Sequence, residues 1–274
     1  TAAVVSNMTR GRSCSCLMAE KAETDVFPID MGIACEVEHR GELHPLTERK
    51  IRRGTSNFTK AAAMARQEVL TAILTGIDAV RVLKEQGYRL SAVGEMGIGN
   101  TTTSSAVASV LLQKDPELVT GAGAGLDPAG LKRKTEAIRR GIGLHHPDPM
   151  DGMEVLQKVG GFDLAAMAGA FLGGAIYHVP VVIDGVIAAA AAAAAGRIAP
   201  AATDYMLAAH VSAEPASIWL LDLIGVTPAI QAGLRLGEGT GALALFPLLD
   251  MALSIYRDMD TFAEMEIEEY KPLV

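Results

Sequence analysis

The sequence is poor in aromatic residues and in cysteine, and each shortage excludes a class of protein. Aromatic residues make up 4% of the 274 positions, although half of all residues are hydrophobic. The core must therefore be built from alanine, leucine, isoleucine, valine and methionine, with close helix packing at glycines. The three cysteines, Cys14, Cys16 and Cys35, have neither a zinc-binding spacing nor an even number for disulfides, which favours a reducing, cytoplasmic location.

The chain also lacks an excess of basic residues. A net charge of -8 argues against a nucleic-acid partner bound through a broad basic surface, so a small-molecule ligand is favoured. Residues 164–183 carry no formal charge, but the glycine pair at 173–174 and Pro180 favour a helix that ends near Tyr177, followed by a buried strand. We therefore expect no membrane span.

Apolar runs alternate with amphipathic stretches, which predicts an α/β fold with a parallel sheet flanked by helices. No interdomain linker or internal repeat is visible, so the 274 residues are expected to form one domain. The polar segment 35–57 is expected to be a surface excursion. The expected strands are 25–33, 89–96 and 179–185, and the expected helices are 1–21, 59–85, 101–113, 130–146, 164–177 and 188–195.

The stretch "GEMGIGNTTTSS", Gly94 to Ser105, resembles a nucleotide-triphosphate loop in which Asn100 stands at the position of the lysine. The missing lysine argues against binding of a nucleoside triphosphate. Glycines still allow the backbone to approach an anion, and a helix beginning at Thr101 would point free N–H groups at it, which suits a single phosphate. An ordinary strand-to-helix turn is the alternative.

Two glutamates stand beside glycines at the ends of apolar elements. Glu238 lies between Gly237 and Gly239, before a long apolar run, and Glu95 follows a predicted strand. Both could flank one ligand, and burial would raise a carboxyl pKa toward the range of a general base. For Glu238 the alternative is a charge that favours the helix dipole. A parallel sheet would bring four segments to one edge: 95–102, 184–185, 210–214 and 235–241.

Other polar residues allow two interpretations. Lys134, in "KRKTEAIRR", is either a ligand-binding cation or part of a solvated helix face. His145 and His146 point in different directions on a helix and have no acidic partner at a suitable spacing, so we expect no metal there. Ser212 has no G-x-S-x-G context, which favours hydrogen bonding to a ligand over a nucleophilic role.

Six ordered segments together resemble the nicotinate-nucleotide:dimethylbenzimidazole phosphoribosyltransferases of cobalamin assembly. The resemblance extends over essentially the whole chain, and its most specific parts are "GEMGIGNTT" and "RLGEGTGAL". It implies a Rossmann-like parallel sheet, a small helical subdomain from the chain ends (about 1–20 and 245–274) and a homodimer. The other four segments are "DPAGLKRKTEAIRR", "KVGGFDLAAMAGAFLGGA", "VPVVIDG" and "HVSAEP".

The resemblance implies transfer of phosphoribose from nicotinate mononucleotide to a benzimidazole-like base, which releases nicotinate and gives α-ribazole phosphate. It assigns Glu238 as the catalytic base and Glu95 as the second glutamate, at the reacting ribose. Neither a cofactor nor a metal is expected, because the donor carries no pyrophosphate and no Asp-Asp pair occurs. The implied donor-binding residues are Gly97, Gly99, Asn100, Thr101 and Lys134 around the phosphate, Gly185 and Ser212 against the nucleotide, and Asp184 nearby.

The sequence departs from this family in two places. Family members carry a further N-terminal segment with a "PPGSLG"-like stretch, so we expect activity to depend on whether that segment is supplied. Val4 lies near the position of a glutamine that faces the acceptor base, which leaves the acceptor open among benzimidazoles, purines and phenols. Two alternatives are a catalytically incompetent nucleotide-binding subunit that partners a fuller paralogue, and a P-loop NTPase. Glu95 and Glu238 oppose the former, and Asn100 opposes the latter.

Overall fold

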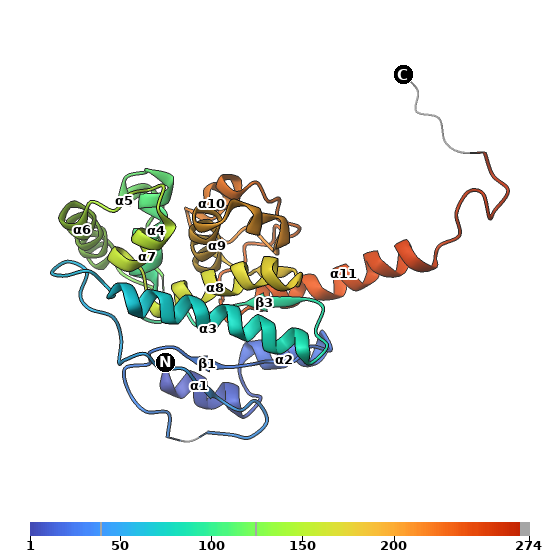
Figure 1. The fold of residues 1–274 in the computed structure, drawn as a ribbon, viewed down its shortest axis with the longest axis horizontal. Coiled ribbons are helices and arrows are strands. Elements are labelled where there is room, and N and C mark those ends of the chain that lie inside the picture. Colours follow the sequence, from blue (N-terminus) through green and yellow to red (C-terminus); the bar gives the residue numbers. More distant parts are fainter. Residues whose placement is uncertain (39, 124, 269–274) are drawn as a thin grey trace.

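The computed structural model describes residues 1–38, 40–123 and 125–268, and its central sheet is parallel. Strands β3 (Ser91–Val93), β4 (Val181–Ile183) and β5 (Met206–Ala208) lie in the order β3-β4-β5. Helices surround this sheet (Figure 1). The predicted α/β class, with a parallel sheet flanked by helices, is therefore confirmed.

Helices make up most of the remaining described structure. A short parallel pair, β1 (Ile29–Asp30) with β2 (Thr47–Glu48), accompanies them. In chain order the helices are α1 (Ala2–Thr9), α2 (Cys14–Lys21), α3 (Arg66–Glu85), α4 (Thr101–Leu112), α5 (Pro116–Val119), α6 (Pro128–His145), α7 (Gly152–Val159), α8 (Phe162–Tyr177), α9 (Val186–Ile198), the 3-10 helix η1 (Pro200–Tyr205), α10 (Ser217–Ile224) and α11 (Thr240–Asp258).

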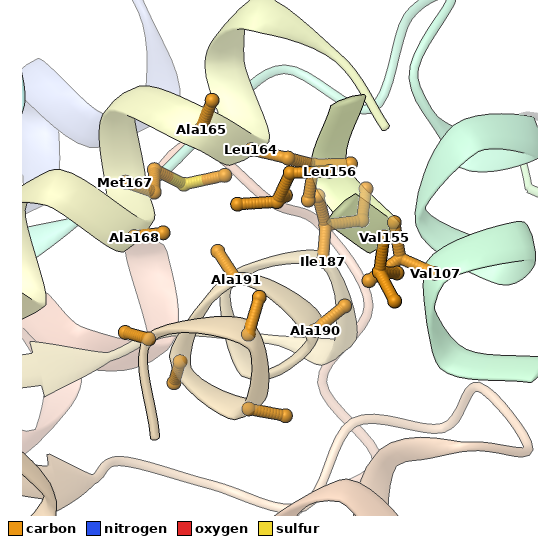
Figure 2. Packing of buried hydrophobic residues seen from close by; sticks show 14 of the residues in the cluster. Val107, Val155, Leu156, Leu164, Ala165, Met167, Ala168, Ile187, Ala190 and Ala191 are labelled. Carbon is orange, nitrogen blue, oxygen red and sulfur yellow. The ribbon is translucent and has the colours of Figure 1, made fainter. Parts of the chain in front are cut away.

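The alanine-rich helix α9 lies at the centre of the core. Its residues 188–195 are all alanine and all buried, and α4, α7, α8 and α10 pack around it. Figure 2 shows Ala190 and Ala191 of α9 among larger side chains such as Leu156 and Met167. Small side chains let several helices approach α9, which explains how a core with few aromatic residues is filled. The predicted packed helix over 188–195 is confirmed.

Glycine allows α3 and α8 to touch through their backbones. A Cβ atom on Gly76 would lie 1.9 Å from the carbonyl oxygen of Ala166, and one on Gly169 would lie 2.0 Å from that of Ile73. No side chain fits at either position, since real Cβ atoms do not approach this closely. The glycines of the apolar run 164–177 therefore pack helices together. Among the described residues, no helix is long and apolar enough to cross a membrane.

The N-terminal part differs from its prediction. The single helix expected over 1–21 is two helices, because Gly11 adopts a left-handed conformation (φ +72°) after α1 and the Ser13 hydroxyl accepts a hydrogen bond from the Cys16 N–H to begin α2. The strand expected over 25–33 is only Ile29–Asp30. It ends because the Asp30 carboxylate accepts hydrogen bonds from two following N–H groups, which turns the chain.

The long helix predicted over 59–85 ends at Glu85 as expected, but it begins at Arg66. The preceding backbone is bound elsewhere, since the N–H groups of Ala63 and Met64 donate to the carbonyls of Lys158 and Gln157. These long-range bonds compete with helix formation. The predicted excursion 35–57 is largely irregular, as expected, although it contributes β2 and buries Val37.

Helix α2, near the N-terminus, contacts the first half of α11 beside the central sheet. Ala19 of α2 shares a buried cluster with Leu243 and Phe246 of α11 and with Val182 of β4. The small subdomain expected from about 1–20 and 245–274 remains a prediction, and its last residues, 269–274, lie outside the described residues.

Candidate active site

A cavity lies at the carboxyl edge of the central sheet, where a parallel α/β fold places ligands. The predicted gathering of four segments at this edge is confirmed, because all four contribute to its lining. Of the predicted site residues, Gly99, Asn100 and Glu238 lie beside the cavity. The others line it: Glu95, Gly97, Thr101, Lys134, Asp184, Gly185 and Ser212.

The glycine loop leads into the N-terminus of α4. Gly97 (φ +68°) and Gly99 (φ +83°) are both left-handed, a conformation that glycine adopts without a steric penalty. A Cβ atom at either glycine would meet nothing within 4 Å, so the loop is open on that side. The first N–H groups of α4, which begins at Thr101, have no partner within a helix and suit an anion.

Lys134 joins this helix N-terminus from α6. Its Nζ donates hydrogen bonds to Thr101 Oγ1 at 3.1 Å and to the Gly121 carbonyl at 2.9 Å. The residue is only 6% exposed, so the alternative of a solvated helix face is wrong. Burial lowers the pKa of Lys134, while the nearby negative charge of Glu214 raises it. Lys134 Nζ is thus held beside Thr101, at the N-terminus of α4.

Glu95 is held within the glycine loop. Its Oε2 accepts hydrogen bonds from the Gly97 N–H and from Asn100 Nδ2, the latter at 2.7 Å. Burial raises the pKa of Glu95 to about 7, and the negative charges of Asp163 and Asp184 add to this, against the two hydrogen bonds. A carboxyl group that changes charge near neutral pH is a candidate catalytic group.

Asp163, in the first turn of α8, was not identified from the sequence. Asn100 Nδ2 donates to Asp163 Oδ2 at 2.7 Å as well as to Glu95, so one amide bridges two carboxyl groups. Burial raises the pKa of Asp163. The structure thus places Asn100 between the loop and α8. The available signal was a lone acid in the run "GGFDLAAMAG".

Asp184 is bound by the backbone at the start of α11. Its two carboxyl oxygens accept hydrogen bonds from the N–H groups of Gly239 at 3.0 Å, Gly241 at 2.7 Å and Ala242 at 3.2 Å. His210 Nε2 lies 3.7 Å from Asp184 Oδ1. Asp184 therefore attaches the Glu238 turn to the end of β4, in addition to lining the cavity.

Glu238 lies in a turn of three left-handed residues. Its φ is +58°, between Gly237 at +83° and Gly239 at +76°. Its N–H donates to the Glu95 carbonyl, and its carboxylate Oε2 lies 3.3 Å from both N and Oγ of Ser15 in α2. The helix-dipole alternative does not describe this contact, because Asp184 caps α11 while the Glu238 carboxylate meets another helix.

The two glutamate loops are in backbone contact. A Cβ atom on Gly94 would lie 2.2 Å from the Gly239 nitrogen and 2.6 Å from its Cα. Only glycine permits this approach. With the hydrogen bond from the Glu238 N–H to the Glu95 carbonyl, it holds the two acidic loops together at this edge of the sheet.

Ser212 and Gly185 complete the predicted set. Ser212 is buried, its N–H donates to Ser217 Oγ at 2.9 Å, and its Oγ accepts from the Glu214 N–H at 3.3 Å. A Cβ atom on Gly185 would have only the His210 ring near it, at 3.8 Å. The cavity thus has room at Gly185 and a polar wall at Ser212.

The histidine pair lies at the end of α6: His145 is its last residue, and His146, in a left-handed conformation (φ +42°), is its C-cap. His145 Nε2 lies 2.7 Å from the carbonyl oxygen of Phe58. Within the described part of the chain, no group of three or more histidine, cysteine, aspartate or glutamate side chains is arranged to hold a metal ion.

The fold and this site define the class of protein as a phosphoribosyltransferase, and a family model described by that word matches residues 1–267. The chain is 44% identical over 273 residues to nicotinate-nucleotide–dimethylbenzimidazole phosphoribosyltransferases of Clostridium acetobutylicum and Ruminiclostridium cellulolyticum, covering 100% of this chain and 76% of each relative. It is also similar to the crystal structure of CobT from Thermus thermophilus, with a TM-score of 0.90, 38% identity and coverage of 97% of this chain and 78% of that one. The chain belongs to the nicotinate-nucleotide–dimethylbenzimidazole phosphoribosyltransferase family.

Proposed function

We propose that this chain transfers phosphoribose from nicotinate mononucleotide to dimethylbenzimidazole or a related base, giving α-ribazole phosphate and nicotinate in cobalamin assembly. One observation carries the proposal: a helix N-terminus with a buried lysine lies at the same sheet edge as two glutamates whose loops are in backbone contact. The first feature suits a single phosphate and the second suits the reacting ribose.

The phosphate of the donor binds at the start of α4. Gly97, Gly99, Asn100 and Thr101 surround it, and Lys134 supplies the positive charge from α6. A charge-assisted hydrogen bond to phosphate is stronger than a neutral one, so a single lysine makes a large contribution. Gly185, Ser212 and Asp184 lie along the nucleotide.

The donor needs no acid catalyst. Its nicotinate ring is a pyridinium, so the bond from its nitrogen to ribose C1′ breaks with the electron pair passing to that nitrogen. Positive charge then develops on the sugar, and the ionised Glu95 stabilises it. Attack from the opposite face converts a β-nucleotide into an α-product.

The acceptor needs a base. One imidazole nitrogen forms the new bond to C1′, and the other loses its proton to the Glu238 carboxylate. General base catalysis of this kind contributes about a hundredfold or more to the rate. The apolar Val4, which is partly exposed on α1, leaves the acceptor class to experiment.

The test is release of nicotinate from nicotinate mononucleotide by the 274-residue chain, with benzimidazole, purine and phenol acceptors and no added metal. We expect acceptor-dependent release from the wild type and a fall of at least about a hundredfold in kcat for Glu238→Gln, with donor binding unchanged. Mononucleotide binding without release would instead support the incompetent-subunit alternative. Loss of donor binding in Glu238→Gln would assign the carboxylate to the donor site.

We also propose a cytoplasmic homodimer. The three cysteines are unpaired thiols, which supports a reducing compartment. The second half of α11 extends away from the other helices (Figure 1), and its large apolar side chains are exposed, including Ile255 at 59% and Tyr256 at 88%. A second copy of the chain would cover this surface. Light scattering, which gives the mass of the species in solution, tests the dimer. We expect a dimeric wild type and a larger share of monomer for Ile255→Asp. A monomeric wild type would contradict the proposal.

A further inference from the structure

Two serines at the start of α2 form a buried hydroxyl pair. The Oγ atoms of Ser13 and Ser15 are 2.7 Å apart, and the residues are 6% and 2% exposed. Ser13 Oγ also accepts a hydrogen bond from the Cys16 N–H at 3.2 Å, which holds Ser13 as the cap of the helix. The position of Ser15 is therefore determined by the first turn of α2.

Ser15 contacts Glu238, the predicted base, although 223 residues separate them in the sequence. Its N–H and its hydroxyl both lie within hydrogen-bonding distance of Glu238 Oε2, at 3.3 Å each. Among the described residues, the second carboxyl oxygen of Glu238 has no hydrogen-bond partner. One oxygen is thus held while the other is left to accept a proton. The buried cluster that joins Ala19 of α2 to Leu243 of α11 keeps the two helices in contact.

We propose that Ser15 is a positioning residue for Glu238, and this inference rests on the proposed function of Glu238 as the base. The hydroxyl hydrogen of Ser13 has two acceptors within reach, Ser15 Oγ at 2.7 Å and Cys16 Sγ at 3.1 Å. When it goes to Ser15, the hydroxyl hydrogen of Ser15 points to Glu238 Oε2, and the Ser15 N–H lies against the same oxygen in either case. These contacts orient the carboxylate and leave its other oxygen facing the acceptor. A contact between α2 and the catalytic turn thereby becomes part of the active site.

The test is Ser15→Ala, which removes the hydroxyl and keeps the backbone N–H. We expect kcat to fall about tenfold, as for loss of one hydrogen bond to a charged group, with an unchanged KM for nicotinate mononucleotide. Ser15→Thr should restore most of the rate, and Cys14→Ala, one residue away and exposed, should have no effect. If Ser15→Ala does not fold, the near-isosteric Ser15→Cys replaces it, with the same expectation.

A double-mutant cycle separates positioning from general damage. If Ser15 acts through Glu238, Ser15→Ala should slow the wild type but add almost nothing to Glu238→Gln. An equal effect in both backgrounds, or a kcat within twofold of the wild type, would overturn the positioning role. Failure of the proposed function would be seen separately, because in that case the wild type itself would release no nicotinate.

Discussion

Replacing Glu95 with glutamine should make the protein more stable at alkaline pH but not at acidic pH. Burial raises the pKa of Glu95 from its ordinary 4.5 to about 7. Since each pKa unit is worth about 1.4 kcal/mol, the difference corresponds to at most about 3 to 4 kcal/mol, and partial exposure of the side chain reduces it. Glutamine is neutral at every pH, and its oxygen can still accept the bonds from Gly97 and Asn100.

The direction follows from which state releases its proton first. Below pH 4.5 the carboxyl is protonated in both the folded and the unfolded chain, so it costs no stability. Between 4.5 and about 7 the unfolded chain ionises while the folded chain keeps its proton, so the free energy of unfolding falls as pH rises. Above about 7 the full cost of the buried charge is present.

The assay is chemical denaturation of the wild type and Glu95→Gln at several pH values. We expect equal free energies of unfolding near pH 4.5 and an advantage for the variant of about 2 to 3 kcal/mol at pH 8. Glu136→Gln, whose side chain is 70% exposed, is the control and should show little pH dependence. An advantage that does not change with pH would refute the assignment of a buried, destabilising charge to Glu95. The stabilised variant should also lose transfer activity, because glutamine cannot balance a cationic sugar.

Two further predictions concern the loops of the site. Lys134→Met should raise the KM for nicotinate mononucleotide about 10- to 100-fold, because it removes a charged hydrogen bond to phosphate. The free energy of unfolding should stay near that of the wild type, because the variant no longer buries an ammonium group. An unchanged KM in steady-state kinetics would place the phosphate elsewhere. Gly94→Ala should lower the free energy of unfolding by about 2 kcal/mol or more and lower kcat at least about tenfold. The reason is that the added methyl group would push the Glu238 turn away from the Glu95 loop. Gly143→Ala, where a Cβ atom meets nothing, is the matched control, and equal stability of the two variants would contradict the contact.

Much of the fold was predictable because its signals are local. The strand before the glycine loop, the helix from Thr101 to about Gln113 and the helix that ends at Tyr177 all follow from apolar periodicity and from glycine or a cap at their boundaries. The helix expected from Thr59 failed at its start because backbone groups of residues 63 and 64 bind the end of α7. Such hydrogen bonds join segments far apart in the chain, so no local sequence pattern predicts them.

The candidate site divides in the same way. Glycine-flanked acids at the ends of predicted strands pointed to Glu95, Asp184 and Glu238, because parallel strands end at one edge of a sheet. Lys134 could not be separated from its exposed neighbours Lys132 and Arg133 by sequence, since burial depends on what packs against α6. Ser15 and Asp163 were missed because their partners, Glu238 and Asn100, are remote in the sequence.

The sequence by itself determined the α/β class, the order of most of its elements and the loops that carry the reactive groups, since periodicity, glycine and capping residues act within a few positions. Only the tertiary structure decided which of those groups meet. It buried Lys134 against Thr101, joined the Glu95 and Glu238 loops through Gly94, and placed Ser15 against a carboxylate 223 residues away. These contacts depend on how helices and strands pack, and packing arises from the summed burial of the whole chain rather than from any short segment.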